Sequence, residues 1–241
     1  MEERVDTAEA ASGPVPLAEA LRPFGWSPGQ CLLLVTCNLV PLLHAAAVVA
    51  ALVVPWARWG WRALAGIALL YLAPPALARL VQRGWPIRCG WIPLGSRDYF
   101  VWWFLLNLQM VFCRFPALEE VLRLMPKVYS AWLRLWGARI GKYVYWAAGL
   151  RILDRSFLDI GDAVVFGAAV RLNPHVVARD ARGELRLALA PITIGDRAMV
   201  GGYSLLTAGT QVAAGECTRA CLISPPFSAW AEGHRQKPDA P

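Results

Sequence analysis

Charged residues are scarce in this chain. Of its 241 residues only 17% are Asp, Glu, Lys or Arg, against about 25% in soluble globular proteins, and 57% are hydrophobic. An intrinsically disordered chain is excluded, because it would need few apolar residues and many charges. A small soluble domain is excluded as well, because one core cannot hide so much apolar surface. We therefore expect part of the chain to lie in a membrane.

Several common functional motifs are missing too. The chain has only three histidines, and its six cysteines form no Cys-x-x-Cys pair, so no zinc or other metal site is expected. We expect the cysteines to be reduced, buried small hydrophobes, consistent with a cytosolic face of the protein. The sequence contains neither a Walker-type phosphate loop nor a Gly-x-Ser-x-Gly elbow. It also lacks a basic cluster with interleaved aromatic residues, so we expect no nucleic-acid partner.

The apolar residues gather in the first half of the chain. No charged residue occurs between Pro23 and Ala57, and within this run Cys31–Val54 exceeds the roughly 20 residues that cross a bilayer. A second apolar stretch, Ala63–Ala78, contains Pro74 and Pro75, which should kink it near its end. The two stretches predict a hairpin of two transmembrane helices.

Two further segments are expected to be helical without crossing the bilayer. Tyr99–Cys113 has only 15 residues and is rich in aromatics, which indicates a re-entrant or interfacial helix more than a span. Pro126 should divide Pro116–Trp136 into two short amphipathic helices. Whether these lie along the bilayer surface or pack as ordinary helices stays open at this point.

The charge distribution predicts an orientation. Residues 1–29 form a polar, acidic leader with five acidic and two basic residues, so the rest of the chain carries a net charge of +10 within the overall +7. Basic residues beside membrane segments indicate anionic membrane lipid and a cytoplasmic position. We expect the protein in the inner (cytoplasmic) membrane, with Arg58 outside and residues 130–241 on the cytoplasmic side.

The second half of the chain has a different pattern, with an apolar residue at every sixth position. One run is Ile194, Val200, Leu206 and Val212, and the others are Ile160, Phe166, Leu172 and, shifted in register, Ile140, Trp146, Ile152, Leu158. Neither a helix nor a regular strand has this period. Glycine follows several of these positions, at 141, 161, 195 and 201, where we read it as the residue that turns a corner. Short strands joined by tight turns, as in a hexapeptide parallel β-helix, account for the pattern.

The segment Gly137–Val144 (GARIGKYV) resembles the entry motif of sugar and polysaccharide O-acetyltransferases among the hexapeptide-repeat acyltransferases. The resemblance covers about residues 130–223 and implies a left-handed parallel β-helix of three to four coils. The hydrophobic front half resembles membrane-attached versions, including the C-terminal β-helix units of membrane-bound nonribosomal peptide synthetases. The fold class expected is a membrane α-helical region over residues 30–136, a β-helix over 137–223 and a polar tail over 224–241.

One interruption of the repeat, between Leu172 and Ile192, is expected to leave the β-helix as a surface loop, and His175 stands at its start. The resemblance implies that this histidine is the general base of acyl transfer, and an imidazole with a pKa near 6.5 suits the task. Asn173 could hydrogen-bond the acceptor or the tetrahedral oxyanion. The alternatives are a surface-loop histidine and a turn-forming asparagine. Asp180 and Glu184 are candidate acidic partners by proximity alone.

The resemblance also implies a thioester donor. Acyl-CoA, for example acetyl-CoA, would be a donor substrate, with no tightly bound cofactor. Small residues at Gly201, Gly202 and Ala208 would admit the pantetheine arm, and Arg219 or Arg197 would meet phosphates. The alternative interpretation is that the small residues form turns and that the arginines are solvated surface charges. His44, within the first span, is read as a packing histidine bonded to a backbone carbonyl.

Taken together, these observations predict a membrane-bound acyltransferase. It would move an acyl group from a thioester to a hydroxyl or amine of a membrane-associated lipid acceptor. The resemblance implies a homotrimer with the active site between subunits. Two alternatives stay open, namely amide-bond formation from a carrier-protein thioester and a non-catalytic trimeric β-helix scaffold. A γ-type carbonic anhydrase would need three histidine ligands for each zinc ion, and this β-helix has one histidine per chain.

Overall fold

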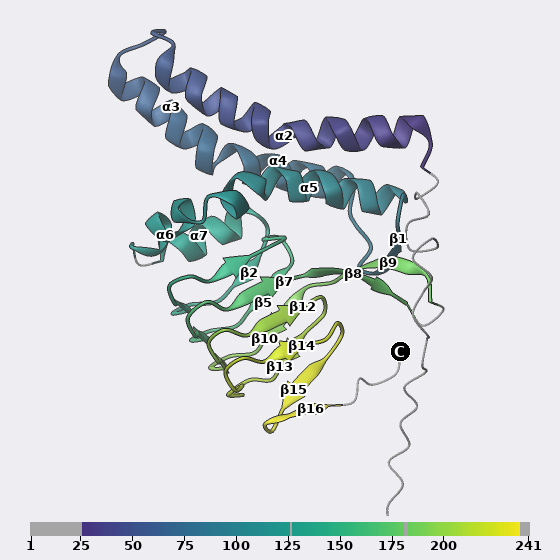
Figure 1. Ribbon diagram of the computed structural model, residues 1–241. Helices are drawn as coiled ribbons and strands as arrows, with labels where there is room; N and C mark the ends of the chain where they lie inside the picture. Colours follow the sequence, from purple (N-terminus) through teal and green to yellow (C-terminus); the bar gives the residue numbers. More distant parts are fainter. Residues whose placement is uncertain (1–25, 126, 181–182, 237–241) are drawn as a thin grey trace, which may run out of the picture.

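A layer of helices lies over a stack of short parallel strands (Figure 1). The computed structural model describes residues 26–125, 127–180 and 183–236. Most of the predicted leader and the last five residues lie outside this range. The helical layer ends at Leu135, and the stacked strands begin at Arg139, close to the boundary between residues 136 and 137 expected from the sequence.

The two apolar stretches form the predicted helical hairpin. Helix α2 (Pro28–Val53) packs against α3 (Trp59–Tyr71), which continues as α4 (Ala73–Gly84). The described chain contains two apolar stretches of 26 residues long enough to cross a membrane, α2 and the α3–α4 pair. The chain breaks at Leu72, just before Pro74 and Pro75, because proline is tolerated in the first turn of a new helix.

His44 lies at the contact between the two arms of this hairpin. Its Nε2 lies 3.0 Å from the backbone carbonyl oxygen of Leu69, to which it donates a hydrogen bond. The interpretation of His44 as a packing histidine is therefore confirmed.

The third apolar stretch becomes helix α5 (Arg97–Arg114), which lies between α2 and the strands (Figure 1). It bends by 80° into α6 (Ala117–Arg123), the geometry of a broken span or a re-entrant loop. A second short helix, α7 (Val128–Leu135), follows, so the expected interruption lies between the two, although Pro126 itself lies outside the described residues. Both short helices bury one face and expose apolar residues such as Val121 and Leu135 on the other.

Three separate parallel sheets form the sides of the strand stack. Their strands are β2 (Arg139–Ile140), β5 (Leu158–Ile160), β10 (Ile192–Ile194), β13 (Gln211–Val212) and β15 (Ala229–Ala231) in the first, β3 (Tyr145–Trp146), β6 (Val165–Phe166) and β11 (Met199–Val200) in the second, and β4 (Arg151–Ile152), β7 (Arg171–Asn173), β12 (Leu205–Thr207) and β14 (Ile223–Ser224) in the third. Each of the first three coils contributes one strand to each sheet, which is the arrangement of a parallel β-helix.

The six-residue pattern predicts the core of these coils correctly. Residues of successive coils pair in register, with Ile140 beside Ile160, Ile160 beside Ile194, and Ile194 beside Val212. All four side chains are buried. In the second sheet the rings of Trp146 and Phe166 stack with centroids 4.9 Å apart. The left-handed sense of the coils stays a prediction.

The glycines that follow the apolar positions do not turn the corners of the coils, as the sequence suggested. Gly141, Gly161, Gly195 and Gly201 have ordinary φ values, and the left-handed corner positions are instead Tyr143, Ala163 and Arg197. A Cβ on Gly161 would lie 2.7 Å from the backbone nitrogen of Asp196 in the next coil. Glycine is required there because neighbouring coils approach too closely for a side chain.

The boundary expected at residue 223 is also wrong. Strand β14 begins at Ile223, and β15 adds a further parallel strand beside β13. The last described strand, β16 (His234–Gln236), folds back antiparallel on β15. Residues 224–236 therefore extend the coils, because Ser224, Ser228 and Trp230 hydrogen-bond or pack within them instead of pointing to solvent.

The cysteines are all free, but most of them are not buried. Cys37 alone is buried, whereas Cys31, Cys89, Cys217 and Cys221 are exposed. Cys217 forms an isolated parallel bridge with Met199, and Cys221 lies at a left-handed corner. Both side chains are exposed, although cysteine is usually a buried residue type.

The close approach of the coils leads to a test. We expect Gly161→Ala to lower the free energy of unfolding by about 1–3 kcal/mol, the typical cost of overpacking. Thermal or denaturant unfolding in detergent would measure it. Gly84→Ala is the matched control, because nothing lies within 4 Å of a Cβ there. An equal stability of the two variants would contradict the packing explanation.

Candidate active site

The interruption of the repeat is a β-hairpin and not a surface loop. Strands β8 (His175–Arg179) and β9 (Leu185–Leu189) pair antiparallel, and β9 also pairs with β1 (Gly90–Pro93) from the helical region. Leu187 and Leu189 are fully buried, in a cluster with Trp102 of α5. The expectation of a loop is wrong because these apolar side chains bind the excursion to the helical layer.

His175 is the first residue of β8 and is held on two sides. Its Nδ1 donates a hydrogen bond to Oδ2 of Asp154. Its ring meets that of Trp102 edge-on, with centroids 4.8 Å apart. The Trp102 Nε1–H in turn donates to Oδ1 of Asp154 at 3.0 Å. The imidazole is therefore fixed in place, yet 16% of the side chain stays exposed.

Asp154 is the acidic partner, and the sequence did not single it out. It lies in the turn between β4 and β5, is buried to 1% exposure, and has a left-handed φ of 48°, which Asp tolerates better than most residues. The two expected partners are wrong, because Asp180 and Glu184 both form ion pairs with Arg186 within the hairpin. The repeat itself could have indicated Asp154. Residues that lie side by side in the first two coils are about 20 positions apart in sequence, and Asp154 precedes His175 by 21.

The surroundings of His175 act on its pKa in two directions. Burial lowers the pKa, while the charge of Asp154 and the hydrogen bond to it raise it more, so the pKa lies above its usual 6.5. With Nδ1–H engaged by Asp154, the neutral ring carries its lone pair on Nε2. Among the described residues Nε2 has no hydrogen-bond partner. The ring is thus prepared to accept a proton at Nε2.

Asn173 lies two residues before His175 at the end of β7, half-buried. It lines a cavity of about 190 Å³ between the end of α5, α6 and the outer face of β4 and β7. Other residues of its wall are Phe112, Cys113, Pro116, Arg151 and Arg171. His175 does not line this cavity, and Asn173 makes no side-chain hydrogen bond among the described residues, so no contact between them joins Asn173 to the His175–Asp154 pair.

A buried ionic network fixes the turn that carries Asp154. The adjacent Arg155 is fully buried and pairs with Glu119 of α6. Its NH1 also donates to Oε1 of Gln109, on α5, at 3.0 Å. Glu119 accepts further hydrogen bonds from Tyr129 and Arg123. Three helices are in this way tied to a single turn of the coils.

The residues predicted to bind the donor are not gathered at His175. Ala208 is fully buried, and a Cβ on Gly201 would lie 2.4 Å from the backbone nitrogen of Ala220, so neither faces an open groove. Gly202 is half-buried at the corner that precedes β12, and Arg219 is exposed beside the corner that precedes β14. His175 follows β7, at the other end of this sheet. Within one chain Gly202 and Arg219 therefore lie at another corner than His175. Only Ala208 lies near the corner of His175, because it follows Thr207, which pairs with Asn173.

The sequence matches no known family model and no curated protein. Solved structures similar to it are hexapeptide-repeat acetyltransferases. One from Vibrio cholerae is 18% identical with a TM-score of 0.32, and the similarity covers 51% of this chain and 89% of that one. A maltose O-acetyltransferase from Clostridium difficile is 18% identical with a TM-score of 0.31, covering 55% and 86%. Because these identities and TM-scores are low, the activity of this chain has to be argued from its own residues.

The His175–Asp154 pair predicts a specific titration. We expect the His175 imidazole to titrate above pH 6.5, and Asp154→Asn to lower that pKa because burial then acts without the opposing charge. The pair should stabilise the fold fully below about pH 6.5, and this contribution should be lost as the pH rises through the folded pKa. NMR of labelled histidine in detergent would measure both, with His175→Gln identifying the signal. If the pKa of His175 is the same in Asp154→Asn as in the wild type, the pairing is contradicted.

Proposed function

We propose that this protein is a membrane-bound acyltransferase. It would transfer an acyl group from a thioester donor, acyl-CoA, directly to a hydroxyl or amine of a membrane-associated acceptor. The observation that carries the proposal is the His175–Asp154 pair, which is held by Trp102 and leaves Nε2 available. This is the arrangement that a general base requires.

The reaction follows from these positions. Nε2 of His175 removes the proton from the acceptor hydroxyl or amine as its oxygen or nitrogen attacks the thioester carbonyl. The tetrahedral intermediate collapses with cleavage of the carbon–sulfur bond, and the imidazolium returns the proton to the leaving thiolate. Asp154 keeps the ring in the correct tautomer and stabilises the imidazolium without taking its proton. Asn173 would hydrogen-bond the acceptor or the oxyanion, a role supported by its position two residues before the base.

A membrane-associated acceptor is supported by the position of the pair. His175 contacts Trp102 of α5, and α5 packs against α2, the first long apolar helix. Many large apolar side chains of the hairpin are exposed, for example Leu42, Leu64 and Leu80, each more than half exposed. Exposed apolar helices of this length are suited to a bilayer, so the base would lie one helix layer below the lipid.

We further propose that the active protein is a homotrimer in the cytoplasmic membrane, with the coils on the cytoplasmic side where acyl-CoA is found. The separation of Gly202 and Arg219 from His175 within one chain supports a groove shared between subunits. In such an assembly the donor would contact one subunit and the base of its neighbour.

The central test is His175→Gln, which keeps a hydrogen-bond donor toward Asp154 but removes the proton acceptor. We expect acyl transfer from radiolabelled acyl-CoA to membrane lipid to fall about 10²–10⁴-fold, the usual contribution of a general base. His234→Gln is the matched control, because His234 is exposed on β16. The detergent-corrected mass of both variants should equal that of the wild type.

The same assay separates the competing functions. Full transfer by His175→Gln would overturn the proposed base. Transfer from a carrier-protein thioester alone would assign the donor to a carrier protein. An assembled wild-type trimer that transfers from neither donor would support a scaffold.

The orientation gives a second test. We expect a cysteine introduced by Arg58→Cys to react with a membrane-impermeant maleimide in intact cells, in a background of Cys31→Ser and Cys89→Ser. The exposed native Cys217 and Cys221 on the coils should react only after permeabilisation. Reaction of these two cysteines in intact cells would reverse the topology.

A further inference from the structure

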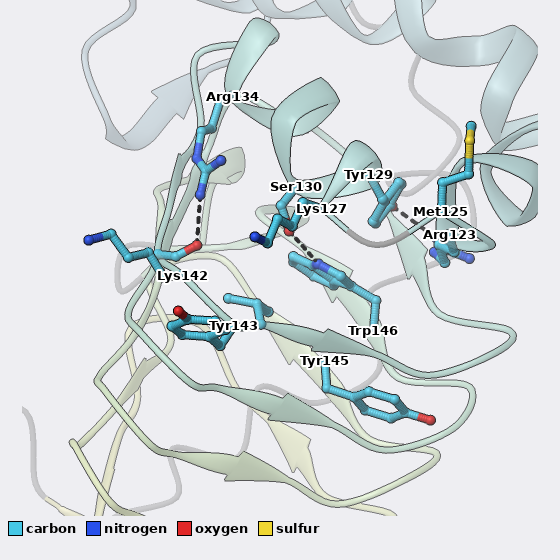
Figure 2. Close-up of a pocket in the computed structure, with 12 residues that line it drawn as sticks. Arg123, Met125, Lys127, Tyr129, Ser130, Arg134, Lys142, Tyr143, Tyr145 and Trp146 are labelled. Carbon is cyan, nitrogen blue, oxygen red and sulfur yellow. Dashed lines mark hydrogen bonds between the residues drawn. The ribbon is translucent and has the colours of Figure 1, made fainter.

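A second, larger cavity lies at another corner of the coils. It has a volume of about 650 Å³ and is enclosed by α7, the end of α6 and the turn between β2 and β3 (Figure 2). This turn leads out of the first sheet, whereas His175 follows a strand of the third. The cavity is therefore distinct from the site of the His175–Asp154 pair.

The wall of this cavity is strongly basic. Lys127, Arg134 and Lys142 contribute three positive charges, and none of the described residues that line it is a carboxylate. A fourth cation, Arg123, is already neutralised by ion pairs with Glu119 and Glu120. Lys127 and Lys142 form no ion pair among the described residues. The cavity therefore carries an uncompensated positive charge that favours an anion.

The arginine in this wall has a fixed position. The Nε of Arg134 donates to the carbonyl oxygen of Ile140 at 2.9 Å, and NH2 donates to that of Gly141 at 2.7 Å. Arg134 is thereby anchored to the first coil with its remaining N–H groups unused by these bonds. A guanidinium held in this way is well suited to the oxygens of a phosphate.

The rest of the wall is apolar and aromatic. Met125, Val144, Tyr145 and Trp146 line it, and Met125 is 51% exposed. Figure 2 shows Arg134 and Lys142 toward one end, Met125 together with the ion-paired Arg123 toward the other, and Lys127 between them. Leu124, next to Met125, is 81% exposed. The cavity thus has a cationic end and an apolar end that continues onto the exposed face of α6 and α7.

We propose that this cavity binds the headgroup of an anionic phospholipid. Its phosphate would lie among Lys127, Arg134 and Lys142, its polar headgroup against Tyr143 and Tyr145, and its acyl chains along Met125 and Leu124. A soluble phosphate would satisfy the cations but would leave the apolar end unused. Anionic lipid is also the abundant ligand of the cytoplasmic leaflet, toward which juxtamembrane basic residues are attracted.

Lipid in this cavity would also act on the helices that hold the candidate active site. Tyr129 and Arg123 line the cavity and at the same time bond Glu119, the partner of Arg155. A bound headgroup would therefore fix α6 and α7 against the first coil, beside the network that positions Asp154. The binding itself does not depend on acyl transfer and can be measured without it.

The test is lipid binding by the full-length protein in neutral detergent. Native mass spectrometry would count bound phosphatidylglycerol and phosphatidylcholine added at equal concentration. We expect phosphatidylglycerol to bind more tightly, and Lys127→Gln and Lys142→Gln each to weaken it about fivefold, the effect of one cation near a lipid surface. Arg235→Gln is the control, because it removes the same charge from an exposed position on β16.

Each outcome bears on the assignment. Equal binding of the two lipids, or an equal loss in Arg235→Gln, would overturn it. Coenzyme A or glycerol phosphate that displaces phosphatidylglycerol from the wild type but fails to bind Lys142→Gln would reassign the cavity to a soluble phosphate ligand. Circular dichroism of each variant would establish that it is folded. A variant that loses lipid but keeps acyl transfer separates this inference from the proposed function.

Discussion

The arrangement of the molecule depends on one buried charge. Arg155 is fully enclosed between the helices and the coils, where a guanidinium is stable only if it is paired. Its pairing with Glu119 and Gln109 requires α5 and α6 to lie over the turn between β4 and β5. Burial lowers the pKa of Arg155 and the charge of Glu119 raises it more, so the group stays charged. Removal of one partner from such a pair typically costs about 3–5 kcal/mol.

The same turn also holds the candidate active site. Asp154 precedes Arg155 and points to Trp102 and His175, while Ser156 follows it and accepts a hydrogen bond from Gln82 of α4 at 2.8 Å. Three consecutive residues therefore join α4, α5, α6 and the β8–β9 hairpin to one coil. A base that is held by a buried carboxylate needs this rigidity, because its ring must keep one tautomer and one direction. The helical layer thus supports the candidate site and also contains the two apolar stretches long enough to cross a membrane.

Much of this fold was predictable because its signals are local or strictly periodic. Burial of Ile140, Ile160 and Ile194 follows from the six-residue spacing, which repeats the same environment in every coil. The two long helices follow from uninterrupted apolar stretches. The role of the glycines was misread, because the close approach of Gly161 to Asp196 is a contact between residues 35 apart in sequence, invisible in the spacing of either one.

The sequence by itself determined the class of each segment and marked His175 as the one histidine between residues 137 and 223. The tertiary structure decided its partner and its setting. Asp154 and Trp102 reach His175 from 21 and 73 positions away, so neither could be selected without the stacking of coils and the docking of α5. Nearby acids, Asp180 and Glu184, were available to the sequence but pair with Arg186 across the hairpin. The hydrophobic periodicity can be seen in the order of the residues along the chain. A polar contact between distant segments exists only once these segments are packed together.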